Sequence, residues 1–177
     1  RQRQMCIRDS FNIFINYGCV LKELGKYENA EIYLKKSINL NPNLAISYVN
    51  LAAVQKDLKK LSEAEKNILK AIKLNPNSGM AFNNFGNILK EKGSLDEAEK
   101  NYWKAINLNK DFYLAYNNIG NLFYTKGDLL NAEKFTQKAI EINPKFESAC
   151  VNLAIIKEGL NKICLLYTSP SPRDDGV

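Results

Sequence analysis

A short pattern, Asn preceded by Leu or Ile and usually followed by Pro, recurs along the chain at a constant spacing of 34 residues. Its four copies are Leu40-Asn41-Pro42, Leu74-Asn75-Pro76, Leu108-Asn109-Lys110 and Ile142-Asn143-Pro144. The period divides the chain without gaps into units 11–44, 45–78, 79–112 and 113–146, followed by a half unit 147–163. Because a unit this short cannot bury its own apolar face, the units must stack against one another in an array.

Each unit has the pattern of two amphipathic helices. In the first helix, large apolar residues occupy the fourth and seventh positions, for example Phe82 and Phe85, and so share one helical face. The eighth position is small in every unit, as Gly18, Ala52, Gly86, Gly120 and Ala154. Because Gly costs a helix interior about 1 kcal/mol relative to Ala, we expect the partner helix to approach closely at this position.

The end of the first helix and the start of the second carry their own signals. Glycines stand where a left-handed C-terminal cap is needed, at Gly25, Gly93 and Gly127. We expect capping boxes at Ser62 with Glu65 and at Asp96 with Glu99 to open two of the second helices. The interior of each second helix then carries small residues at contact positions: Ala30, Ser37, Ala64, Ala71, Ala98, Ala105, Ala132 and Ala139.

The period, the small positions and the closing prolines together resemble the tetratricopeptide repeat family over residues 11–163. The resemblance implies an all-α fold, a right-handed superhelical solenoid of antiparallel helix pairs whose first helices line a concave groove. Three residues depart from the family pattern and put local packing in question: Cys150 replaces an aromatic residue, Thr136 a bulky residue and Lys59 the glycine between the helices.

The two ends of the chain differ from its middle. The four arginines all lie in the end segments, as Arg1, Arg3, Arg8 and Arg173. Met5–Ser10 can be encoded by ATG TGT ATA AGA GAC AG plus one base, and the reverse complement of that string encodes Cys164–Thr168 in another frame. Both ends therefore resemble the translated transposase adaptor of short-read libraries. We expect residues 1–10 and 164–177 to be artefacts, and the natural protein to be longer.

Composition excludes several classes of site. The chain has no His, which excludes Ser-His and Cys-His catalytic couples and His-ligated metal sites. Cys19 and Cys150 lack metal-ligand spacing, and we expect both to be buried, in a reducing compartment. We therefore expect no catalytic residue, metal or cofactor, and a cytoplasmic location; this part of the chain is not predicted to be an enzyme.

The charge of the chain bears on its partners. A net charge of +6 suggests nucleic acid, but the lysines are spread over all units beside acidic residues, and residues 11–163 contain no Arg for bidentate recognition. No apolar run is long enough to span a membrane. We therefore expect a protein or peptide partner, with no nucleic acid and no membrane.

Asparagine is the one polar residue with a clear pattern on the first helices. It fills the sixth position of every unit, as Asn16, Asn50, Asn84, Asn118 and Asn152, and it recurs close by as Asn83, Asn87, Asn117 and Asn121. Because a carboxamide both donates and accepts, such a ladder can hold the backbone of an extended peptide. The alternative is that Asn is abundant throughout this chain. Lys56 and Lys90 align at the twelfth position with Lys22, either as a basic edge for acidic ligands or as solvated helix ends.

We predict a protein-interaction scaffold that binds an extended peptide or a partner helix in the groove. Segments such as Tyr48–Ala52 and Tyr116–Gly120 resemble the repeat arm of O-linked N-acetylglucosamine transferases, so the alternative is the substrate-recruiting arm of a larger protein-modifying enzyme. The family's clamp for chaperone tails needs Lys and Arg where this chain has Ile15, Cys19, Met80 and Asn84, so we expect no clamp. Uncapped ends of the array could also join two copies into an oligomer.

Overall fold

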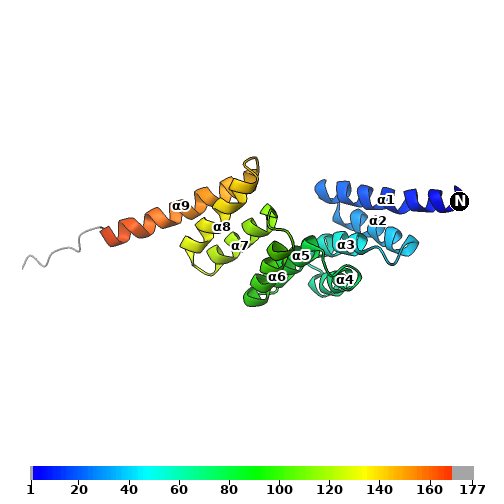
Figure 1. Ribbon diagram of the computed structural model, residues 1–177, viewed down its shortest axis with the longest axis horizontal. Helices are drawn as coiled ribbons and strands as arrows, with labels where there is room; N and C mark the ends of the chain where they lie inside the picture. The colour runs from blue at the N-terminus through cyan, green and yellow to red at the C-terminus, as the bar shows by residue number, and fades with distance from the viewer. Residues whose placement is uncertain (1, 169–177) are drawn as a thin grey trace, which may run out of the picture. The chain divides into compact units, whose positions relative to one another are not determined.

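The computed structural model describes the backbone of residues 2–168 and the side chains of residues 11–161. Within those ranges all regular secondary structure is helical (Figure 1). The helices are α1 (Gln2–Glu23), α2 (Tyr27–Leu40), α3 (Ala45–Asp57), α4 (Leu61–Leu74), α5 (Gly79–Glu91), α6 (Leu95–Leu108), α7 (Tyr113–Thr125), α8 (Leu129–Ile142) and α9 (Glu147–Thr168). The side chains of both predicted artefact segments, 1–10 and 164–177, lie outside the described residues, so that prediction remains untested.

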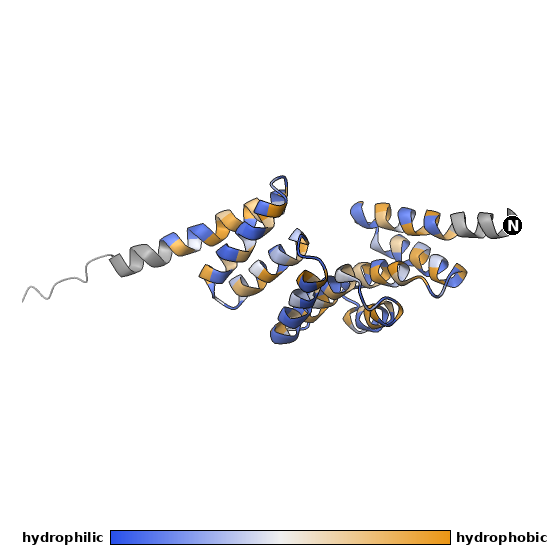
Figure 2. Ribbon diagram, in the orientation of Figure 1, coloured by the Kyte–Doolittle hydropathy of each residue, from blue (hydrophilic) through white to orange (hydrophobic). Residues whose placement is uncertain are grey.

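The chain forms two compact units, residues 1–110 with helices α1 to α6 and residues 111–177 with helices α7 to α9. In each unit, packing is most extensive between the two helices of a pair, such as α3 with α4 or α7 with α8. Short turns join the helices of a pair, so they run antiparallel. Apolar and polar residues are intermixed along the coloured parts of the helices (Figure 2). In α4, for example, the buried residues Ala64, Ile68 and Ala71 share one helical face.

The predicted helix ends are confirmed at the turns inside three pairs. Gly25, Gly93 and Gly127 have positive φ angles of 71°, 84° and 82°. Lys59 stands at the equivalent turn with φ of 62°, although a side chain makes this conformation unfavourable. The repeat therefore imposes the same left-handed turn even where its sequence lacks the glycine.

The small eighth position is confirmed as the point of closest approach between paired helices. A Cβ atom on Gly86 would lie 2.5 Å from Cε1 of Tyr102, and one on Gly18 would lie 2.8 Å from Cγ of Leu34. In the second unit of the repeat, Ala52 occupies this position and shares a buried core cluster with Ile68. Each small residue is therefore matched to the particular side chain that packs over it.

Two predictions about local structure are wrong. Helices α4 and α6 begin two residues earlier than the capping boxes at Ser62 and Asp96 require, and their cap residues make no side-chain cap hydrogen bond. Instead, Ser78 and Asp128 cap α5 and α8, with Oγ and Oδ1 accepting from backbone N–H groups at 3.2 and 3.1 Å. The two cysteines, expected to be buried, are not: Cys150 is exposed, and Cys19 is only partly buried because it borders an open cleft between α1 and α3.

Thr136 carries the one buried side-chain polar atom without a hydrogen-bond partner among the described residues. Its side chain is completely buried against the helix that contains Gly120. Because an unpaired buried hydroxyl loses its hydration without compensation, Thr136→Val should stabilise the fold by about 1 kcal/mol in chemical denaturation. The exposed Thr125→Val is the matched control and should change stability by less than about 0.5 kcal/mol. A loss of stability in Thr136→Val would contradict the assignment of an unpaired hydroxyl.

Candidate functional site

The first helices α1, α3 and α5 of unit 1–110 contact one another in sequence and form one face of that unit. Two clefts open among their side chains. The larger cleft, of about 140 Å³, is lined by Gly18, Cys19, Lys22, Glu23, Leu34, Asn50 and Val54. The smaller cleft, of about 70 Å³, is lined by Lys22, Ala53, Lys56, Asn84 and Asn87. Side chains from three successive first helices therefore converge on one surface.

The structure places the predicted amides of unit 1–110 in different environments. Asn16 is exposed, and Asn50 is partly buried, with Nδ2 donating to Sγ of Cys19 at 3.4 Å. Asn84 and Asn87 line the same small cleft, where Oδ1 of Asn87 accepts from the hydroxyl of Tyr102 at 2.8 Å. Asn83 is only 4% exposed, so it offers little surface to a ligand.

The predicted amides of unit 111–177 partly bond to each other. Asn152 donates from Nδ2 to Oδ1 of Asn117 at 2.9 Å, which joins α9 to α7. Asn117 is 6% exposed, whereas Asn118 and Asn121 are partly buried. A peptide ligand in this unit would therefore compete with the Asn117–Asn152 hydrogen bond for one of the amides.

The lysines of the predicted basic edge lie beside carboxylates. Lys56 pairs with Asp57 at 2.9 Å and with Glu91 at 3.6 Å, and Lys22 lies 3.9 Å from Asp57. Lys90 is partly buried, and its burial lowers the pKa of its ammonium group. These carboxylates were not among the predicted site residues. Their signal is present in the sequence, because an acidic residue follows the aligned lysine in three successive units.

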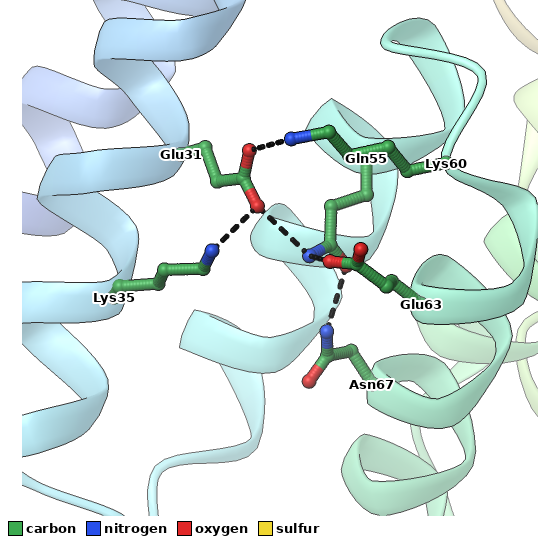
Figure 3. A network of polar contacts seen from close by, with 6 residues as sticks. All are labelled: Glu31, Lys35, Gln55, Lys60, Glu63 and Asn67. Atoms are coloured by element: carbon green, nitrogen blue, oxygen red, sulfur yellow. Dashed lines mark hydrogen bonds and ion pairs between the residues drawn. The ribbon is translucent and has the colours of Figure 1, made fainter.

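A network of polar side chains, with Gln55 at its centre, connects helices α2, α3 and α4 (Figure 3). Gln55 is 1% exposed, and its Nε2 donates to Oε1 of Glu31 at 3.1 Å and to Oε2 of Glu63 at 3.0 Å. Its Oε1 accepts from Nδ2 of Asn67 at 2.7 Å. The repeat pattern did not reveal this network, because Gln55 and Glu31 lie 24 residues apart on different helices and Leu89 replaces Gln55 in the next repeat.

Ionisable groups in the network hold Glu31 in its charged form. Lys35 and Lys60 each approach the carboxylate of Glu31 at 2.7 Å. Burial alone would raise the pKa of Glu31, but hydrogen bonds from Lys35, Lys60 and Gln55 outweigh it and lower the pKa to about 2. This carboxylate therefore serves as an anchor between helices and not as a proton donor near neutral pH.

Three further features bear on the function of the described residues: metal-ligating clusters, the Cys19 thiol and the apolar character of the helices. No cluster of three or more His, Cys, Asp or Glu residues among them has the geometry to hold a metal ion. Burial raises the pKa of the Cys19 thiol, which disfavours the nucleophilic thiolate. Within the described residues, no helix combines the length and the apolar character needed to cross a membrane. The arrangement offers amides, paired charges and apolar surface, which are groups suited to binding.

Comparison with solved structures shows the same fold in several proteins. The Pseudomonas aeruginosa pilF protein aligns over 88% of this chain and 71% of its own, with 20% identity and a TM-score of 0.76. A chain of the APC/C hetero-tetramer Cut9-Hcn1 aligns over 86% of this chain and 31% of its own, with 17% identity and a TM-score of 0.78. The first TPR of Spaghetti (RPAP3), solved with the HSP90 peptide SRMEEVD, aligns over 67% of this chain and 94% of its own, with 23% identity and a TM-score of 0.61. These similarities confirm the predicted all-α solenoid of helix pairs.

Sequence comparison gives a consistent assignment. No curated protein sequence matches the chain. Family models described as tetratricopeptide repeat match residues 11–44, 45–78, 67–100 and 113–146, and a model described as TPR repeat matches residues 86–127. Together the matches extend without interruption from residue 11 to residue 146, and the chain therefore belongs to the tetratricopeptide repeat family.

Proposed function

We propose that this chain is a protein-interaction scaffold that holds an extended peptide or a partner helix on the face of its first helices. The observation that carries the proposal is the small cleft where Asn84 and Asn87 of α5 meet Lys22 of α1 and Lys56 of α3. Amides and ammonium groups from three helices thus point at one place. Neither catalysis nor a cofactor is needed to explain this arrangement.

The chemistry of the cleft favours a peptide backbone as the ligand. A free amide side chain offers donors and an acceptor, which match the C=O and N–H groups of an extended chain. Each hydrogen bond contributes about 0.5 to 1.5 kcal/mol net, so a few of them give weak binding with little preference for side chains. Because Asp57 and Glu91 balance Lys56, the face has no strong preference for acidic peptides.

A fold neighbour supports the proposal but differs in its chemistry. The first TPR of Spaghetti (RPAP3) holds the HSP90 peptide SRMEEVD. In this chain, Ile15, Cys19 and Met80 replace cationic residues of the clamp that the family uses for chaperone tails. We therefore propose a ligand held along its backbone and not by a terminal carboxylate.

The test is to select peptides on the full chain by phage display and to measure the best binder against variants. Asn50→Ala combined with Asn84→Ala, both on the first helices of unit 1–110, should weaken that peptide by about tenfold, because two backbone hydrogen bonds are lost. Helicity by circular dichroism should not change. Asn29→Ala on α2 removes an exposed amide from a second helix and is the matched control. Unchanged affinity in the double variant would remove the amide ladder from the proposal.

Two further proposals concern the longer protein and its assembly. The asparagine at the sixth position of every first helix also favours the alternative of a substrate-recruiting arm in a larger protein-modifying enzyme. The gene sequence beyond Ile163 distinguishes that arm from a pure scaffold.

Separately, α1 exposes an apolar stripe that includes Tyr17 and Val20, and α9 exposes Val151 and Ile155. Light scattering on the purified chain tests whether such faces join copies into an oligomer.

A further inference from the structure

A larger cleft, of about 320 Å³, lies away from the asparagine ladder, between α2 and α4 with α3 beneath. It is lined by Lys35, Ile38, Asn39, Tyr48, Leu51, Gln55, Glu63, Lys66 and Asn67. None of these side chains lines the two clefts among the first helices. The volume is at the lower end of the range for ligand pockets, which suits one or two side chains of a partner.

The lining of this α2–α4 cleft combines apolar and cationic groups. Ile38, Tyr48 and Leu51 form its apolar part, and the hydroxyl of Tyr48 is already bonded to the carbonyl of Pro42 at 3.1 Å. Lys35 and Lys66 are exposed and belong to facing helices, and Lys66 makes no ion pair with any described residue. An apolar side chain flanked by carboxylates matches these groups.

The polar network fixes one wall of the cleft. Lys35, Gln55, Glu63 and Asn67 belong to both the network and the lining (Figure 3). The Nδ2 of Asn67 is held by Gln55 at 2.7 Å, so its oxygen remains free to accept from a ligand. A wall that is ordered before binding reduces the entropy lost when a ligand binds.

The charges of the cleft favour an acidic ligand. Glu63 is the one carboxylate in the lining, and one of its oxygens accepts from Gln55 at 3.0 Å. Glu31 lies behind the wall and is already bonded to Lys35 and Lys60. The ammonium group of Lys66 is thus the charge in the lining that lacks a partner among the described residues.

The equivalent place one repeat later, the junction of α4 and α6 over α5, has different side chains. Leu69 and Leu89 stand at the positions of Lys35 and Gln55, and Phe82 stands at the position of Tyr48. There, Nζ of Lys104 lies 4.1 Å from the centre of the Phe82 ring. The polar wall is therefore not repeated at the next junction, which supplies matched control positions.

We propose that the α2–α4 cleft is a second protein-binding site, which takes an acidic segment of a partner with one large apolar side chain. The apolar side chain lies on Ile38, Tyr48 and Leu51, and a flanking carboxylate pairs with Lys66. This site lies outside the groove of the proposed function and does not depend on it.

The experiment titrates the full chain with the fluorescein-labelled peptide GDDFDDG and follows fluorescence anisotropy. Lys66→Glu should weaken binding by about tenfold, because it turns an attraction into a repulsion at close range. Lys100→Glu makes the same charge change at the equivalent position of the next repeat and should alter affinity less than about twofold. The peptides GDDADDG and GKKFKKG should both bind at least about tenfold more weakly than GDDFDDG.

Several results would overturn the proposal. Equal weakening by Lys66→Glu and Lys100→Glu would show non-specific attraction to a basic protein. Binding of 4-phenylbutanoate without binding of GDDFDDG would make the cleft a small-molecule site. A loss of GDDFDDG affinity in the Asn50→Ala, Asn84→Ala double variant would place the peptide in the groove of the first helices. Unchanged affinity in that variant is expected, whatever the result of the groove experiment itself.

Discussion

Replacing Gly86 with Ala is expected to destabilise the chain by about 2 kcal/mol, although Ala is the better helix former by about 1 kcal/mol. The added Cβ would lie 2.5 Å from Cε1 of Tyr102, and contacts that close force a neighbour to move. Tyr102 cannot move easily, because it is completely buried and its hydroxyl donates to Asn87 at 2.8 Å. Urea denaturation followed by circular dichroism measures the change in the free energy of unfolding.

The chain contains its own control for this substitution. In the second unit of the repeat, the same pair of positions is Ala52 and Ile68, and both side chains are completely buried in one core cluster. Gly86→Ala in a Tyr102→Ile background copies that pair, so the cost of the alanine should disappear. Equal destabilisation in the two backgrounds would show that the Tyr102 ring is not the cause of the cost.

The fold was predictable where one position has the same role in every repeat. Glycine recurs at the eighth position and at the turn with the spacing of the repeat. This recurrence indicates that the backbone needs a glycine at both positions. The structure gives each a cause, a close approach at Gly86 and a left-handed backbone at Gly93. Lys59 has the same left-handed backbone as the glycines at the equivalent turns, although a lysine side chain disfavours it. Its position in the repeat therefore predicts its conformation better than its residue type does.

Features that depend on a single pair of neighbours were not predictable. Ser62 and Glu65 have the spacing of a capping box, but α4 starts at Leu61, and tertiary packing decides where a helix begins. The contact of Gln55 with Glu31 joins residues from different helices, without any periodic signal.

The candidate site shows the same division between periodic and local features. The sixth-position asparagines were identified by their spacing, yet neighbouring positions of a helix differ in direction by about 100°. The structure separates Asn84, which lines a cleft, from Asn83, which is buried. Spacing therefore identifies a helical face, and only packing shows which amides on it remain accessible.

The stability of the chain should fall steeply below pH 4.5 because of Glu31. Its pKa is lowered from 4.5 to about 2 in the folded chain. A group with a lowered folded pKa contributes its full stabilisation above the unfolded value of 4.5 and loses it as the pH falls towards 2. The loss should be about 2 kcal/mol, after allowing for the solvent exposure of Lys35 and Lys60.

Glu31→Gln separates this contribution from that of the other carboxylates. The variant should be less stable than the parent by about 2 kcal/mol at pH 7, and the difference should shrink towards zero as the pH falls to 2, where about half of Glu31 is protonated in the folded chain. Glu141→Gln is the matched control, because Glu141 is exposed and its ion pair among the described residues is with the exposed Lys138 at 3.0 Å, so its effect should stay below about 0.5 kcal/mol throughout. Urea denaturation across this pH range gives both curves. A Glu31→Gln difference that does not vary with pH would mean that the ion pairs with Lys35 and Lys60 contribute nothing, and that side-chain shape alone holds α2 against α3.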